Sequence, residues 1–158
     1  MRLVEVRSYK LKNNTFNLFH QLFVEQSVPM LIKWGTDVVA FGPSPQQDDE
    51  YFLIRSYENL HDLNQRQNDF YSSEEWRNGP REAIVEKIET SLNTLFWLSQ
   101  AGIEDLALEL LDVLGVKTLF QLGIAVSAHR ALVGGLTRVA QPDSVHWDFA
   151  SPTPKGVR

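Results

Sequence analysis

Near the start of the chain, ionisable and aromatic residues alternate with aliphatic ones. Glu5, Arg7 and Tyr9 are each separated by one residue, so a strand would place all three on one face. Val4 and Val6 would then lie on the opposite face. An arginine can hold a carboxylate or enolate oxygen, a glutamate can move a proton, and a tyrosine hydroxyl can donate a hydrogen bond. This combination indicates a site for a small organic molecule that is anionic or aromatic.

A second segment, residues 51–57, repeats the pattern. Its Arg55 and Tyr57 alternate with Phe52 and Ile54, so the polar and apolar residues again separate onto two faces. If the two strands are neighbours, their chemistry-bearing side chains come together. A later apolar strand adds an aromatic residue. Glu5 is therefore the candidate catalytic residue, and the candidate ligand-binding residues are Arg7, Tyr9, Arg55, Tyr57 and Trp97.

Two interpretations of this set stay open. In the first, Arg7 or Arg55 binds a ligand, and Glu5 acts on it. In the second, Glu5 and Arg55 form a cross-strand ion pair that only satisfies two buried charges. A buried ion pair is weak evidence for either stability or function. Polar groups that converge on one point mark a functional site in some proteins and only a structural ion pair in others. The residue types alone do not decide between the two.

The elements that must position these residues follow from hydrophobic periodicity and from helix and turn signals. An apolar stripe from Phe16 to Trp34 predicts a helix that Pro29 should kink. Asn14 or Thr15 is expected to cap that helix, and Gly35 to end it. Ser72 to Glu75 has the spacing of a capping box. The predicted strands are 3–11, 37–41, 51–57 and 92–98, and the predicted later helices are 60–70, 72–78 and 81–89.

The resulting order, β-α-β-β-α-β, predicts an α+β, ferredoxin-like fold. It is a four-stranded antiparallel sheet with helices on one face, and the first and third strands are neighbours at its centre. We expect the helices to cover the aliphatic face that carries Val4 and Ile54. The polar face would then be open, and two molecules would hide it by packing sheet to sheet around a barrel-like cavity.

The composition bounds the class of protein. The 158 residues, 43% of them hydrophobic and 22% charged, suit a globular domain. A net charge of -5 and the lack of a basic cluster argue against nucleic acid or an anionic membrane as the main partner. The absence of cysteine suits a cytoplasmic protein, and neither a signal pattern nor a transmembrane segment is expected.

The sequence predicts neither a metal site nor a cofactor. His20 is a single histidine on the first helix, and His61, His129 and His146 are scattered, so no set has the spacing of metal ligands. Gly134-Gly135 lacks the third glycine of a phosphate-binding loop.

Four segments resemble NIPSNAP-family proteins, a branch of the dimeric α/β-barrel superfamily. They are Val4–Lys12, Val28-Pro29 with Trp34-Gly35, Tyr57–Leu60 and Ser73–Trp76, in the order in which the family has them. Asn13-Asn14 stands where Pro-Gly is usual, which changes a loop. The resemblance implies a homodimer with a cavity in each subunit, and it implies no catalytic residue.

The resemblance covers residues 1–106, which we predict to be a NIPSNAP-like dimeric α/β-barrel domain. Residues 107–158 form a C-terminal extension, with a helical part that could dock on the barrel or its twin, followed by a loose tail. Two functions are open. One is the binding of a small molecule in the dimer-enclosed cavity, with cofactor-free oxygenase or isomerase chemistry as a possible activity. The other is a noncatalytic homodimeric protein-interaction module.

Overall fold

The computed structural model describes residues 1–114, which form one four-stranded antiparallel sheet and the helices packed on it. The sheet order is β2-β3-β1-β4, so the two strands that carry the polar residues are central neighbours, as predicted. The predictions for residues 115–158, including His129 and His146, lie outside the described residues. The strands are β1 (Arg2–Leu11), β2 (Asp37–Pro43), β3 (Glu50–Tyr57) and β4 (Ile88–Leu98).

The first helical region is divided in a way that the periodicity did not reveal. It consists of α1 (Phe16–Leu22), the π-helix η1 (Phe23–Ser27) and α2 (Val28–Lys33). Pro29 lies in the first turn of α2 and has no N–H to donate backwards, so the wider π turn lies just before it. Gly35 ends the helix at a φ of 79°, as expected.

Two predicted helix caps were wrong in detail. The hydroxyl of Thr15 donates to the Lys12 carbonyl at 2.7 Å and does not cap α1. Ser73, and not Ser72, caps the short helix α4 (Glu74–Arg77) by accepting from the Trp76 N–H at 3.2 Å. Asn59 caps α3 in the same way, accepting from the Asp62 N–H at 3.0 Å. The later helices are α3 (Leu60–Ser72), α4 (Glu74–Arg77) and α5 (Arg81–Val85).

The last helix before β4 is shorter than predicted. The apolar spacing of Ile84 and Ile88 suggested a helix over 81–89, but α5 ends at Val85. Ile88 instead pairs with Leu11 at the end of β1. Pairing along the whole of β1 lengthens β4 and overrides a helical pattern of only two apolar residues.

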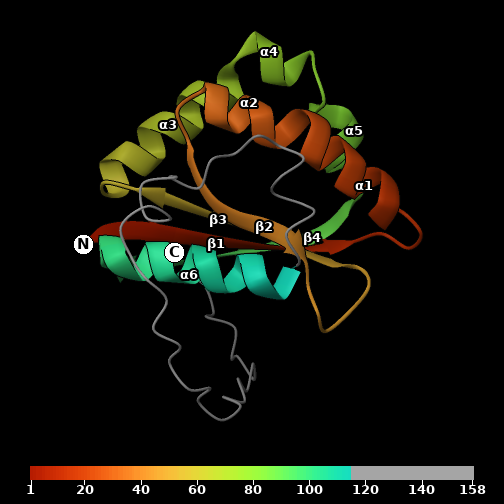
Figure 1. The fold of residues 1–158 in the computed structure, drawn as a ribbon. Helices are drawn as coiled ribbons and strands as arrows, with labels where there is room; N and C mark the ends of the chain where they lie inside the picture. The colour runs from red at the N-terminus through yellow and green to blue at the C-terminus, as the bar shows by residue number, and fades with distance from the viewer. Residues whose placement is uncertain (115–158) are drawn as a thin grey trace, which may run out of the picture. The chain divides into compact units, whose positions relative to one another are not determined.

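The two faces of the sheet are covered by different helices. Helices α1 to α5 lie on one face, and α6 (Gln100–Leu114) lies on the other (Figure 1). Tyr9 and Leu53 from the sheet join the core under α1 to α5, together with aromatic residues of the helices. Val4 and Ile54 instead pack against Ile103 of α6.

The predicted separation of polar and aliphatic residues onto two faces is therefore confirmed, but the predicted side was wrong. Glu5 and Arg55 are paired neighbours on the face that α1 to α5 cover. The same face carries Tyr9, Tyr51 and Tyr57, all of them buried. Large aromatic side chains bury more apolar area than valine and isoleucine, so this face supplies the main core despite its charges.

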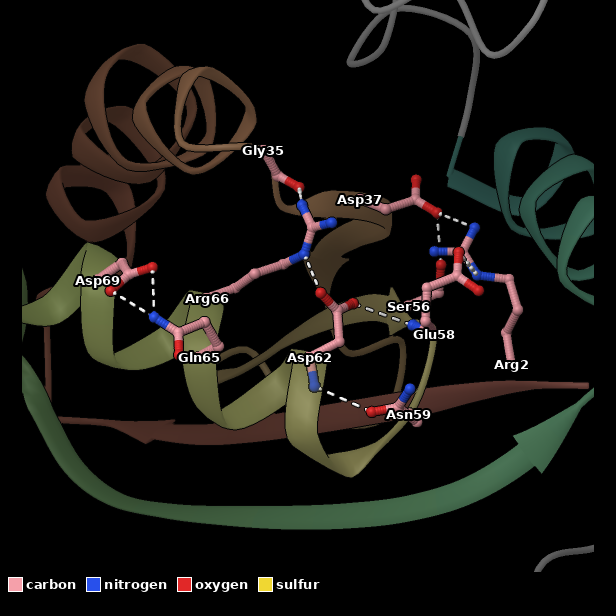
Figure 2. A network of polar contacts seen from close by, with 10 residues as sticks. All are labelled: Arg2, Gly35, Asp37, Ser56, Glu58, Asn59, Asp62, Gln65, Arg66 and Asp69. Carbon is pink, nitrogen blue, oxygen red and sulfur yellow. Dashed lines mark hydrogen bonds and ion pairs between the residues drawn. The ribbon is translucent and has the colours of Figure 1, made fainter.

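A polar network fixes α3 to one end of the sheet (Figure 2). Arg2 of β1 forms an ion pair with Asp37 of β2 at 2.8 Å, and Ser56 of β3 donates to the same carboxylate at 2.5 Å. On α3, Arg66 pairs with Asp62 at 2.6 Å and donates to the carbonyl of Gly35. Glu58 connects the two groups, because its side chain lies 3.9 Å from Arg2 and its backbone N–H donates to Asp62 at 3.0 Å. Together with the Arg66–Gly35 bond, this contact holds the start of α3 at one end of the sheet.

Helix α6 continues through residue 106, where the domain boundary was predicted. Its Ile103 and Ala107 are both buried on the sheet, one on each side of that position. The division at 106 stays a prediction. Among residues 1–114 no helix has the length and apolarity that crossing a bilayer requires.

We expect Ile103→Ala to lower the free energy of unfolding by about 2–4 kcal/mol, because it removes a buried side chain from the α6–sheet contact. Leu108→Ala, on the half-exposed side of the same helix, is the control and should cost much less. Urea denaturation of both variants measures the difference. Equal small losses would mean that α6 does not stabilise the sheet.

Candidate functional site

The polar residues of β1 meet α3 in register. Leu63, Gln67 and Tyr71 recur every four residues, a repeat of about 6 Å along a helix. Leu3, Glu5 and Arg7 recur every two residues, a repeat of about 6.8 Å along a strand. Because the two repeats nearly match, each α3 residue faces one β1 residue: Leu63 packs with Leu3, Gln67 bonds Glu5, and Tyr71 bonds Arg7.

Glu5 is the centre of this contact, and its carboxylate is fully used. Oε2 accepts from Arg55 Nε at 3.0 Å, from Arg55 Nη2 at 2.6 Å and from Gln67 Nε2 at 3.0 Å. Oε1 accepts from Arg7 Nη2 at 3.1 Å. Four donors fill the acceptor positions of a carboxylate. The side chains of Glu5 and Arg55 are 2% and 1% exposed, so this is the cross-strand pair that the sequence left as an alternative.

The environment of Arg55 keeps it charged. Burial alone would lower the pKa of Arg55, but the neighbouring Tyr71, Tyr57 and Glu5 raise that pKa above its ordinary value. Its guanidinium also lies 6.0 Å from the centre of the Tyr57 ring. Arg55 is therefore a permanent cation inside the core.

Tyr71 connects the two arginines. Its Oη accepts from Arg7 Nη1 at 3.0 Å and from Arg55 Nη1 at 3.2 Å. A tyrosine hydroxyl that accepts two bonds still has its own proton to donate. Within the described residues, that proton has no acceptor. The charges of Arg7 and Arg55 against Glu5 leave the cluster with one positive charge in excess.

The other predicted site residues are placed differently. Tyr9 packs edge-on and tilted against Phe23 and Phe19, and burial raises its pKa. Tyr57 is fully buried, and burial raises its pKa to about 12. The Tyr57 Oη is buried and has no hydrogen-bond partner among the described residues. Both tyrosines are neutral core residues, and neither reaches the Glu5 carboxylate by a hydrogen bond.

Trp97 lies outside the cluster, on an exposed part of the same sheet face. Paired residues of neighbouring strands share a face, and β4 pairs with β1 through Arg7–Asn93, Glu5–Leu95 and Leu3–Trp97. The helices leave these β4 residues exposed, with Leu95 at 45% and Trp97 at 51%. Arg7 is 17% exposed and lies between the buried cluster and this surface. We call Asn93, Leu95 and Trp97 the β4 strip.

Sequence reasoning missed Gln67 and Tyr71. A signal for them was present, because the buried Leu63 and Phe70 define the inner side of α3. Gln67 and Tyr71 fall on that side at helical spacing, four and eight residues after Leu63. A glutamine on the inner side of a helix indicates a buried polar partner in the sheet.

Other features of the described residues lie apart from the cluster. His20 accepts from or donates to the Tyr51 hydroxyl at 2.9 Å, and burial lowers its pKa, which favours a neutral ring. An open depression of about 840 Å³ lies between the 12–17 and 47–49 loops and includes Phe16 and Asp49. Within residues 1–114 no three histidine or acidic side chains gather as metal ligands would.

Solved structures identify the fold. A NIPSNAP-family protein from Agrobacterium tumefaciens matches with a TM-score of 0.58 and 16% identity, over 63% of this chain and 87% of its own. A NIPSNAP-like domain protein from Burkholderia xenovorans matches with a TM-score of 0.58 and 19% identity, over 63% and 86%. The chain has the NIPSNAP fold. The predicted resemblance to this family is thus confirmed at the level of the fold.

The NIPSNAP fold of this chain is shared more widely. A Bordetella bronchiseptica protein, named as a candidate antibiotic biosynthesis monooxygenase, matches with a TM-score of 0.50 and 18% identity, over 62% of this chain and 97% of its own. No protein-family model matches the sequence, and no curated protein matches it significantly. The fold is therefore established, and among the described residues the buried polar cluster is the feature that indicates a function.

We expect Glu5→Gln to lower the free energy of unfolding by about 3–5 kcal/mol, because it leaves the buried Arg55 and the partly buried Arg7 without their carboxylate. Glu89→Gln, on an exposed position of β4, is the matched control and should change stability by less than about 0.5 kcal/mol. Chemical denaturation at neutral pH measures both. A loss below about 1 kcal/mol for Glu5→Gln would contradict the central role of the pair.

Proposed function

We propose that this NIPSNAP-fold protein binds a small organic anion on the β4 side of the buried cluster. Arg7 and the Tyr71 hydroxyl are the groups that would hold the anion. The observation that carries the proposal is the hydrogen bonding of Tyr71, whose oxygen accepts from two arginines while its proton has no acceptor among the described residues. An anion next to that hydroxyl would receive the proton as a charge-assisted hydrogen bond.

The charge balance supports the same ligand class. Arg7 and Arg55 face one carboxylate, Glu5, so one positive charge is not neutralised inside the cluster. Arg7 is the only one of the three with appreciable exposure. Its Nε is buried, so a ligand does not reach it, whereas Nη1 and Nη2 each keep one N–H beyond their bonds to Tyr71 and Glu5. A carboxylate would neutralise the excess charge and use these spare donors.

Catalysis is not part of this proposal. Glu5, the candidate catalytic residue, already accepts four hydrogen bonds and is 2% exposed, so it has no position from which to take a substrate proton. Arg55 would act indirectly, by holding Tyr71 in place. Oxygenase or isomerase chemistry therefore stays a prediction without a residue assigned to it, and so does a cytoplasmic location.

Tyr71→Phe should weaken the binding of octanoate by about 1.5–3 kcal/mol, or roughly 10- to 150-fold in Kd, because it removes the donor to the carboxylate. Tyr57→Phe removes a nearby hydroxyl that is buried away from the β4 strip and should leave the Kd unchanged. Isothermal titration calorimetry gives both values. Equal affinities for wild type and Tyr71→Phe would remove Tyr71 from the site.

A second candidate function, the noncatalytic homodimeric module, is favoured by the other face of the sheet. On that face α6 covers Val4 and Ile54, whereas Leu92 and Phe96 of the edge strand β4 are exposed. Exposed apolar residues on an edge strand are typical of a protein contact. We propose that a second copy of the chain packs on this part of the sheet face.

If the homodimer forms there, Phe96→Asp should convert a dimer into a monomer, because it would bury a charge between the two copies. Val85→Asp, which places the same charge on an exposed position of α5, should leave the dimer intact. Sedimentation equilibrium of the two variants and the wild type distinguishes these cases. A wild type that is monomeric at all concentrations would exclude the module.

A further inference from the structure

The geometry points to the shape of the ligand, and we infer that it is an unbranched or planar carboxylate whose apolar body lies along the β4 strip. This inference rests on the proposed function, since the carboxylate is held by Arg7 and Tyr71. It adds the direction in which the body runs, its length and the residues that it contacts.

The direction follows from the pairing of β1 with β4. Arg7 is paired with Asn93, and the next two residues on the same face of β4 are Leu95 and Trp97. Toward Ser91, in the other direction, the face carries a small polar residue beside Tyr9, which is buried. Apolar surface that remains exposed therefore extends from Arg7 toward Trp97, and a ligand body gains more contact by running that way.

The length follows from the rise of a strand. Leu95 is two residues and Trp97 four residues beyond Asn93, so they lie about 7 Å and about 13 Å along β4 from the anchor. A carboxylate whose body is shorter than about 7 Å would contact neither residue fully. One of about 13 Å would cover both.

Leu60 of α3 also supports a ligand body that ends near Trp97. Leu60 lies eleven residues before Tyr71, which is about three helical turns, so both lie on the same side of α3. Leu60 is at the start of the helix and is 53% exposed. Leu63, one turn further, packs at the row of Leu3, which is the row of Trp97. An exposed leucine on this side of α3 adds apolar surface at the far end of the strip.

The experiment titrates the full chain with hexanoate, octanoate and decanoate and follows binding by calorimetry. Each CH₂ that becomes buried should improve the Kd by up to about fourfold. Trp97→Ala should weaken decanoate by tenfold or more and leave hexanoate unchanged, whereas Arg7→Gln should weaken all three by a similar factor. Trp34→Ala, at another partly exposed tryptophan, is the control and should leave the Kd of all three carboxylates unchanged.

The outcomes separate this inference from the proposed function. If no carboxylate binds, or if 1-decanol binds as tightly as decanoate, the anion site itself is wrong. If the carboxylates bind through Arg7 with an affinity that depends on neither length nor Trp97, the anion site stands and the extended body along β4 is overturned. If Trp97→Ala changes the sedimentation of the protein and not the binding of decanoate, the strip is a contact between copies, and the inference is likewise overturned.

Discussion

The ion pair between Glu5 and Arg55 constrains the rest of the structure. Both residues lie on the two central strands and are almost fully buried, and a buried charge without a partner would cost several kcal/mol. The pair can form only in one register of β1 and β3, because a slip by one residue would turn one partner to the face that α6 covers. The charges therefore contribute specificity to the sheet more than net stability.

The Glu5–Arg55 pair also constrains how α3 packs on the sheet. Its third partner, Gln67, comes from α3, and the near-equal repeats of helix and strand then bring Leu63 and Tyr71 to the neighbouring rows of β1. Bonds from Asp62 to Glu58 and from Arg66 to Gly35 hold the start of α3, which keeps the helix from sliding to another register. Tyr71 reaches both arginines as a consequence of these two constraints, and the candidate anion site follows from the packing of the core.

The local pattern of residue types was sufficient to predict the fold and which residues share each face of the sheet. The alternation of Val4 and Glu5 predicted the two faces correctly, and the order of elements predicted the central position of β1 and β3. The pattern of residues along the strands could not predict which face the helices cover, since charged residues are usually expected to face solvent. That choice depends on summed burial, and the buried tyrosines outweigh the cost of two arginines once Glu5 satisfies them. Gln67 and Tyr71 of α3 were missed for the same reason. They can be recognised as partners of Glu5 and Arg7 only when it is known that α3 covers the polar face of the sheet.

The edge position of β4 explains how one strand can serve two contacts. Within residues 1–114, β4 has a neighbouring strand on one side only, and the helices leave its side chains exposed on both faces of the sheet. Alternation sends Leu95 and Trp97 to the side of Arg7, and Leu92 and Phe96 to the side of α6. A small molecule on the first side and a second copy on the other would therefore not compete for the same residues. They would be linked only through the backbone of β4, so a substitution on one side should leave the contact on the other side intact.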